Sequence, residues 1–233
     1  MRIGLYGGSF NPVHLGHVGI ARRAIADLGL DKLIVIPANV SPFKTATATG
    51  TEASRFWTWD RVEMVKAAFR DVEKTTVDLR EIERGGVSYA IDTVREIHAE
   101  LSAASNSNSS SNSASNSNSS LQLFFIIGED SVEGLPRWKD IEELKKLVTF
   151  KAYPRTPESS TAIRELFENA GVVLNQDEKI VKVVRDGLVR KGGYCPCRLP
   201  KLPEFFCPCD EFKAQLADPT YHGLCHCRLY VKP

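Results

Sequence analysis

Residues Gly7 to His17 read GGSFNPVHLGH, and this stretch decides how the first part of the chain is expected to fold. It follows RIGLYG, a short apolar run typical of a buried strand, and leads into apolar residues at helical spacing up to Leu28. In α/β proteins a nucleotide binds at such a place, outside the carboxyl end of a parallel strand. Gly7 and Gly8 let the backbone come close to a phosphate, and the amides that open the helix face an anion. The stretch therefore predicts a phosphate site.

The two histidines of this stretch, His14 and His17, are three residues apart, so both can point to one side of the first helical turn. Imidazoles there can donate hydrogen bonds to charge that develops on a phosphate. Each feature alone has a plainer explanation, since two glycines after a strand are usually a turn and a histidine pair is as often structural, or a metal site that needs a third ligand. The stretch is neither a Walker A loop nor a G-x-G-x-x-G motif.

Apolar runs alternate with helix-like segments through the first two thirds of the chain. Strands are predicted at RIGLYG, KLIVIP, TTVDL, LQLFFIIG and VTFKAY, and helices at about 16–28, 59–69 and 88–101. This alternation indicates an α/β fold with a parallel sheet. The strands are continuously apolar, which fits a sheet covered by helices on both faces.

Composition narrows the class of protein. The chain has 233 residues, 42% hydrophobic and 25% charged, so it can build a core and is not disordered throughout. The net charge of +1 gives no global basic field, so no nucleic-acid partner is expected. No apolar run approaches the roughly 20 residues that span a bilayer. No signal peptide is recognised at the N-terminus, and a cytoplasmic protein is expected.

Two changes in amino-acid composition divide the chain. Residues 102–120 consist only of Ser, Asn and Ala, which predicts a disordered surface loop, either a tether or, more simply, a neutral insertion. After about residue 165 two further helices are predicted, followed by all six cysteines. We expect two domains, residues 1–165 and residues 166–233.

GGSFNPVHLGH resembles the signature of the nucleotidylyltransferases that carry a (T/H)xGH motif. Within them the chain is similar to bacterial nicotinate mononucleotide adenylyltransferases, through matching segments in the same order: VIPANVSPFK (35–44), RVEM, SYAIDTV (88–94), FIIGEDS (125–131) with Trp138 downstream, and SSTAIRE (159–165). The match covers about residues 1–165. Two departures stand out: Ala90 occupies a place where the family commonly has Thr, and the stretch before Ser159 is shorter than usual.

This resemblance implies a Rossmann-like fold and a reaction in which nicotinate mononucleotide attacks the α-phosphate of ATP. The products are deamido-NAD and pyrophosphate, and Mg²⁺ accompanies ATP. It implies phosphate contacts from His14 and His17, with Lys44 as a further cation, and from Ser160, Thr161 and Arg164. It places nucleotide contacts at Gly7, Gly8, Ser9 and Phe10, and pyridine-nucleotide contacts at Asn39, Asp130 and Trp138. Without the motifs, Trp138 would be taken as a core residue and Arg164 as half of a surface ion pair.

The six cysteines form three CxC pairs, at 195–197, 207–209 and 225–227. In an intracellular chain such pairs favour a metal or redox site over structural disulfides. A four-thiolate zinc site would leave two cysteines over. A 4Fe–4S cluster also takes four, and the other two can form a redox disulfide.

CPCR, FFCPCDE and GLCHCRLYV, in this order after NQDEKIVKVVRDGLVRKGGY, resemble the catalytic subunit of ferredoxin–thioredoxin reductases. The resemblance implies a small, mainly helical iron–sulfur domain. It implies that the 4Fe–4S cluster is held by Cys195, Cys207, Cys209 and Cys225. It makes Cys197 and Cys227 the redox disulfide with His226 beside them, and ferredoxin and a thioredoxin-like protein the partners.

Three functions follow from these observations. The first, which we favour because both the HxGH and the SSTxIR halves are present, is an adenylyltransferase with an iron–sulfur redox appendage. The second is a ferredoxin-dependent disulfide reductase with a degenerate nucleotide domain. The third is a scaffold that binds nucleotide and zinc without turnover.

Overall fold

The computed structural model describes residues 1–43, 52–107, 121–154, 156 and 158–233. Contacts within the chain divide it into two compact units. Unit 1 contains Met1–Ser9, Ala21–Phe43 and Lys74–Arg155, and unit 2 contains Phe10–Ile20, Lys44–Glu73 and Thr156–Pro233. This division differs from a cut at residue 165, which stays a prediction.

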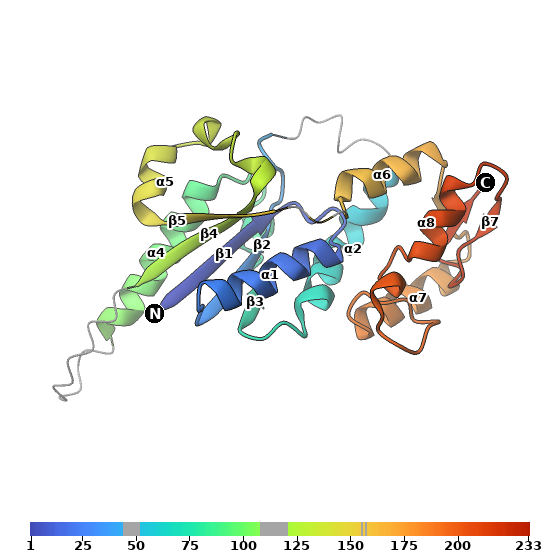
Figure 1. Ribbon diagram of the computed structural model, residues 1–233, viewed down its shortest axis with the longest axis horizontal. Helices are drawn as coiled ribbons and strands as arrows, with labels where there is room; N and C mark the ends of the chain where they lie inside the picture. Colours follow the sequence, from blue (N-terminus) through green and yellow to red (C-terminus); the bar gives the residue numbers. More distant parts are fainter. Residues whose placement is uncertain (44–51, 108–120, 155, 157) are drawn as a thin grey trace. The chain divides into compact units, whose positions relative to one another are not determined.

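Unit 1 is built on a five-stranded parallel sheet in the order β3-β2-β1-β4-β5 (Figure 1). The strands are β1 (Arg2–Gly8), β2 (Lys32–Pro37), β3 (Thr75–Val77), β4 (Gln122–Gly128) and β5 (Thr149–Tyr153). All five were predicted, and the parallel α/β class is confirmed. The order reverses between β1 and β4, which makes the carboxyl ends of these two strands the switch point where such sheets bind ligands.

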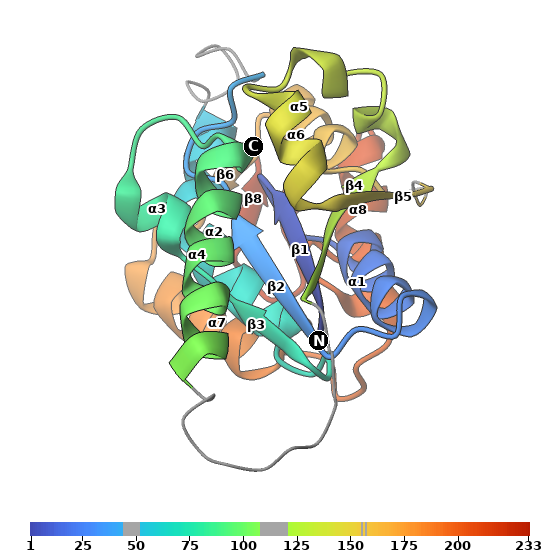
Figure 2. The ribbon, with the colours of Figure 1, turned by 90° about the vertical axis from the view of Figure 1, so that its left-hand side faces the viewer.

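Helices α4 (Ala90–Ser107) and α5 (Ile141–Leu147) cover one face of this sheet. Ile91, Val94 and Ile97 of α4 and Leu144 of α5 are fully buried against alternate residues of β1, β2 and β4. The helix between β1 and β2, α1 (Leu15–Asp27), belongs to a crossover in the other direction. Right-handed crossovers in opposite directions place helices on opposite faces, so the sheet is covered on both (Figure 2).

Helix α4 corrects the predicted limits of the Ser/Asn/Ala loop. The helix continues to Ser107, so residues 102–107 are helical rather than loop, while 108–120 lie outside the described residues. Two alanines favour the helix, and extending an existing helix costs far less than starting one. The short polar helices α3 (Arg80–Arg84) and α5 were not predicted.

Unit 2 contains the helices α2 (Glu52–Phe69), α6 (Ser160–Asn169), α7 (Glu178–Arg190) and α8 (Asp210–Ala217). It also contains a small antiparallel sheet in the order β6-β8-β7, made of Val173–Leu174, Tyr230–Lys232 and Gly223–Leu224. The cysteine-bearing part therefore adds three short strands to the predicted helices. Phe167, Phe212 and Tyr230 pack together at its centre.

No helix in the described part of the chain has the length and apolar character needed to cross a bilayer.

Candidate functional site

The histidine pair opens α1 and is held by its own backbone. The His14 amide donates to Nδ1 of His17 at 3.2 Å, and the His17 amide donates to the His14 carbonyl at 3.0 Å. Because Nδ1 of His17 accepts a hydrogen bond, the neutral His17 ring carries its hydrogen on Nε2. The two rings are 3.8 Å apart between centroids. Both predicted histidines therefore form one pair at the start of the helix.

The Phe10 ring packs against His17 of this pair. Its ring is buried, with 2% exposed, and meets the His17 ring edge-on at 5.0 Å and the Phe69 ring at 5.9 Å. An aromatic ring wedged between two others fixes the imidazole through packing. The side chain of Phe10 therefore acts on the histidine rather than lining an open surface.

Side chains of the SSTxIR segment form hydrogen bonds to the backbone of the loop that precedes His14. Ser159 caps α6 by accepting from the Ala162 amide. The Ser160 hydroxyl donates to the Pro12 carbonyl at 2.8 Å, and the Arg164 guanidinium donates to the Asn11 carbonyl and to Thr161 Oγ1. The two halves of the predicted phosphate site, about 150 residues apart in sequence, thus meet within unit 2. Ser160 and Arg164 therefore hold the backbone of the loop.

Burial lowers the pKa of Arg164 from its ordinary value, and the carboxylates of Glu168 and Glu165 oppose that shift. A half-buried guanidinium that has given up part of its hydration is well suited to receive an anion.

Glu158 belongs to this site although the sequence did not single it out. Its Oε2 accepts a hydrogen bond from the Gly16 amide at 2.8 Å and lies 3.9 Å from Nδ1 of His14. Only glycine fits at position 16, since a Cβ there would come within 2.1 Å of Thr156 Oγ1 and 2.9 Å of Nδ1 of His14. A carboxylate thus occupies a free amide of the α1 N-terminus, where an anion is expected to bind.

Within unit 1, Asn39 lies just beyond the carboxyl end of β2. Its amide donates to the Ser88 hydroxyl at 2.8 Å, and its side-chain Nδ2 donates to the Gly86 carbonyl at 2.9 Å. The predicted pyridine-side residue is therefore bonded directly to the start of the SYAIDTV segment.

The buried Glu81 supports this arrangement and was also missed by the sequence. Thr93 Oγ1 donates to its carboxylate at 2.6 Å, and the Ser88 hydroxyl is a second partner. Burial raises the pKa of Glu81, while the hydrogen bonds from Thr93 and Ser88 pull it down. Glu81 lies on the unpredicted helix α3, and only its low exposure of 7% reveals that its carboxylate works inside the fold.

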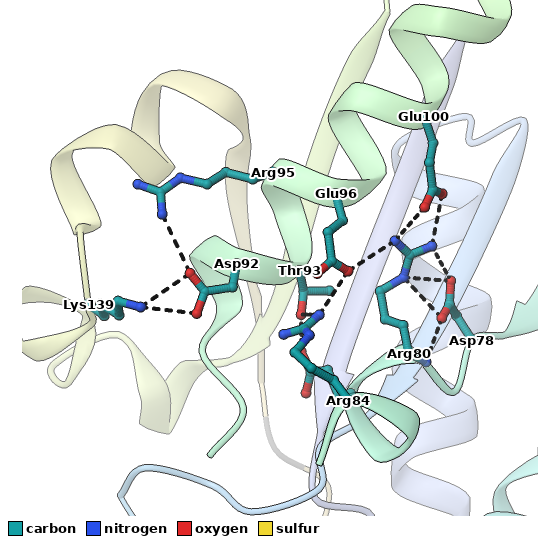
Figure 3. A network of polar contacts seen from close by, with 10 residues as sticks. Asp78, Arg80, Arg84, Asp92, Thr93, Arg95, Glu96, Glu100 and Lys139 are labelled. Carbon is teal, nitrogen blue, oxygen red and sulfur yellow. Dashed lines mark hydrogen bonds and ion pairs between the residues drawn. The ribbon is translucent and has the colours of Figure 1, made fainter. Parts of the chain in front are cut away.

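Trp138 packs edge-on against Phe125 and Phe150, with centroids 5.7 and 6.0 Å away, and Phe43 lies beyond it at 6.5 Å. The neighbouring Lys139 reaches Asp92 of α4 at 3.0 Å (Figure 3). Two predicted pyridine-side segments, around Ser88–Val94 and Trp138, thus adjoin within unit 1. Trp138 is half-buried, so part of its side chain packs against the core and part remains exposed.

Asp130 follows β4 and is exposed, and its carboxylate lies within 2.4 Å of where a Cβ on Gly128 would be. Burial is the main cause that raises the pKa of Tyr6, and the charge of Asp130 adds to it.

The glycines that end β1 were predicted to contact nucleotide. The Gly8 carbonyl accepts a hydrogen bond from the Ala38 amide at 2.9 Å, while Gly7 lies beside Phe125. Gly7, Gly8 and Ser9 thus belong to unit 1, at the carboxyl end of β1. Lys44 lies outside the described residues.

The cysteines gather in unit 2. Cys195, Cys207, Cys225 and Cys227 are buried, Cys209 is half-buried and Cys197 is exposed. The sulfurs of Cys225 and Cys227 are 3.6 Å apart. A hydrogen bond from Cys227 is the main cause that lowers the pKa of Cys195 to about 6 and that of Cys225 to about 7.

Cys227 shows the opposite shift, since giving its hydrogen to Cys195 and Cys225 raises its pKa. Burial raises the pKa of Cys207 and, less strongly, that of Cys209. His226 is exposed, and its positive charge contributes to the lowered pKa of Cys195. The hydrogen bonds from Cys227 therefore shift the pKa values of Cys195 and Cys225 down and that of Cys227 up. In the described ranges, no three His, Cys, Asp or Glu side chains are already placed to hold a metal ion.

Comparison with known proteins shows which family the chain belongs to. A probable nicotinate-nucleotide adenylyltransferase from Aliarcobacter butzleri is 33% identical over 71% of this chain and 78% of its own length. One from Gemmatimonas aurantiaca is 34% identical over 74% and 72%, and one from Shouchella clausii is 39% identical over 66% and 68%. The cytidylyltransferase-like family model matches residues 5–185, which include both halves of the histidine site. The chain belongs to the cytidylyltransferase-like family.

Proposed function

We propose that this protein is a nicotinate-nucleotide adenylyltransferase of NAD biosynthesis. The observation that carries the proposal is the joining of the HxGH loop to the SSTxIR helix through Ser160 and Arg164. The relatives named above, whose names carry this activity, support the choice of reaction. The missing Thr at position 90 removes one hydroxyl from the pyridine side and leaves the phosphate side intact.

In the proposed reaction a phosphate oxygen of nicotinate mononucleotide attacks the α-phosphorus of ATP. A new P–O bond forms, the bond between the α-phosphorus and its bridging oxygen breaks, and pyrophosphate leaves with the electron pair. His17 donates from Nε2 to a phosphate oxygen, and His14 and Arg164 add positive charge or hydrogen bonds as negative charge develops. Mg²⁺ enters as part of the MgATP substrate.

The residues of unit 1 hold the second substrate in this proposal. Asn39, fixed through Ser88 and Gly86, presents its amide to the pyridine carboxylate, and the Trp138 ring stacks on the pyridine. Asp130 contacts the same nucleotide, and Gly7, Gly8, Ser9 and Lys44 serve the triphosphate. Positioning of the two nucleotides supplies much of the rate, because the reaction is a direct in-line displacement.

Turnover with purified full-length chain tests this proposal. MgATP is incubated with nicotinate mononucleotide, with nicotinamide mononucleotide, or alone, and the products are separated chromatographically. We expect a dinucleotide and an equal amount of pyrophosphate, formed faster from the nicotinate substrate. Release of phosphate or AMP without any dinucleotide would contradict the proposal.

A second function is proposed for the cysteines, because the structure gathers all three CxC pairs in unit 2, with four of the six sulfur-bearing side chains buried. Thiolates are the ligands that a 4Fe–4S cluster takes. The chemistry of the donors therefore fits, although no three such side chains in the described residues are placed to hold a metal ion. Cys195, Cys207, Cys209 and Cys225 are the proposed cluster ligands.

Cys197 and Cys227, with His226 beside them, are the proposed redox pair. Ferredoxin is proposed as electron donor and a thioredoxin-like protein as acceptor. The hydrogen-bond partners of Cys227 are Cys195 and Cys225, which makes the pairing with Cys197 a point to test directly. A reductase whose nucleotide domain has lost activity is the alternative, and turnover in the assay above excludes it.

Anaerobic purification of the chain and of six single Cys→Ser variants tests this second function. Iron, sulfide and the visible spectrum are measured. We expect the four ligand variants to lose iron, and Cys197→Ser and Cys227→Ser to keep it. Zinc without iron in the unaltered chain would contradict the redox function and favour a structural zinc site.

A further inference from the structure

The carboxylate of Glu158 lies at the N-terminus of α1. Its Oε2 accepts from the Gly16 amide at 2.8 Å, across 142 residues of sequence. Gly16 is the second residue of the helix, so its amide is one of the four that have no partner within the helix. These amides are the donors that a helix offers to a phosphate. Glu158 therefore engages a group that the proposed triphosphate site needs.

Two anions do not share this position. Like charges a few ångströms apart repel strongly where water is partly excluded, and His14 beside the carboxylate has only 12% of its side chain exposed. The site is also tight, since Thr156 and His14 crowd Gly16 so closely that a Cβ would not fit. A phosphate oxygen can take the Gly16 amide only after the carboxylate has left it.

Glu158 is placed to leave. Its side chain is 36% exposed, and its 3.9 Å separation from Nδ1 of His14 is too long for a hydrogen bond. Among the residues that the structure describes, its one hydrogen bond is to the Gly16 amide. Lys213 lines the same small cavity as Glu158 and His14, and its ammonium pairs with Asp210.

We propose that Glu158 is an internal competitor of the nucleotide triphosphate, which closes the phosphate site of the free chain by occupying the Gly16 amide. The inference rests on the proposed adenylyltransferase function for its biological meaning and on Glu158, Gly16 and His14 for its mechanism. A site that is closed about two thirds to nine tenths of the time binds its ligand about three- to tenfold more weakly than an open one.

The test is titration calorimetry with pyrophosphate, which binds without turnover. Glu158→Gln keeps the size of the side chain and removes its charge. Glu178→Gln removes a carboxylate from the first turn of α7, also in unit 2, and serves as the matched control. We expect Glu158→Gln to bind pyrophosphate about three- to tenfold more tightly, with a parallel fall in the KM for ATP. The control should stay within twofold of the unaltered chain.

Equal or weaker binding by Glu158→Gln, with a normal melting temperature, would overturn the inference and leave Glu158 as a helix cap. If Glu158→Gln does not fold, Glu158→Ala is titrated in its place with the same expectation. Tighter binding by the variant together with absence of dinucleotide from the unaltered chain would keep the competition and overturn adenylyl transfer. Dinucleotide formation by the unaltered chain, together with unchanged pyrophosphate affinity in Glu158→Gln, would support adenylyl transfer and overturn the competition.

Discussion

His17 has a defined hydrogen-bonding role because the His14 amide donates into its Nδ1. The ring hydrogen on Nε2 is then the one that can reach a phosphate. We predict that His17→Ala lowers the rate of adenylyl transfer by about 10²-fold or more, since removal of one donor to developing charge has this effect in comparable sites. Rates are measured with both substrates saturating. His98→Ala, on α4, is the control.

Rates for His17→Ala within a few-fold of the unaltered chain would remove His17 from the mechanism. A similar loss in the His98 control would point to a general effect on the fold.

Ser88 links the buried Glu81 to the Asn39 amide, and so its hydroxyl fixes the loop after β2. We predict that Ser88→Ala raises the KM for nicotinate mononucleotide roughly fivefold, as expected for a lost hydrogen bond of about 1 kcal/mol, and leaves the KM for ATP nearly unchanged. Steady-state kinetics with each substrate varied in turn provide the measurement. Equal changes in both KM values would mean that Ser88 does not serve the pyridine side.

At the scale of elements, α3 is tied to α4 by ion pairs rather than by an apolar face. Arg80 bonds to Asp78 just before α3 and to Glu100 of α4, and its side chain is only 18% exposed (Figure 3). We predict that Arg80→Ala lowers the free energy of unfolding by about 1–2 kcal/mol. Lys66→Ala, which breaks the exposed Lys66–Glu63 pair, should cost less than about 0.5 kcal/mol. Denaturant titration measures both variants.

The ion pair between Arg80 and Asp78 predicts that the free energy of unfolding depends on pH. Hydrogen bonds from Arg80 and its charge overcome the effect of burial and lower the pKa of Asp78 below its ordinary 3.8. A carboxyl whose pKa is lower in the folded chain stabilises the fold above pH 3.8, and this contribution is lost as pH falls through the lowered pKa. In Arg80→Ala that part of the acid sensitivity should disappear. An unchanged acid profile would mean that the ion pair contributes nothing to folding.

Some elements could be predicted from the sequence and others could not, for physical reasons. The central strands β1, β2 and β4 are continuous apolar runs, so local pattern alone predicts them. The edge strands β3 and β5 are less apolar and are predicted from their β-branched and aromatic residues. The helix α3 consists of five mostly charged residues, and contacts to α4 that no local pattern contains hold it, among them Arg80 to Glu100 and Thr93 to Glu81. The histidines could be predicted because the motif keeps them together. Glu158 could not, because its partner Gly16 is distant in sequence.

At the scale of the whole molecule, the Ser/Asn/Ala stretch offers nothing apolar to bury. We predict that replacing residues 108–120 by a short Gly-Ser turn changes the melting temperature by no more than about 2–4 °C, the shift that roughly 1 kcal/mol produces in a chain of this size. Differential scanning calorimetry and the turnover assay are the measurements. A fall of ten degrees or more, or loss of turnover, would show that the stretch serves the fold or the site.

Adenylyl transfer moves the α-phosphorus of ATP into the dinucleotide. The most direct test supplies ATP labelled with ³²P at the α-phosphate together with unlabelled nicotinate mononucleotide, and follows the label by chromatography. We expect the label to move into the dinucleotide in the presence of the unaltered chain and to stay in ATP with His17→Ala. Label recovered in AMP, or left in ATP by the unaltered chain, would contradict adenylyl transfer.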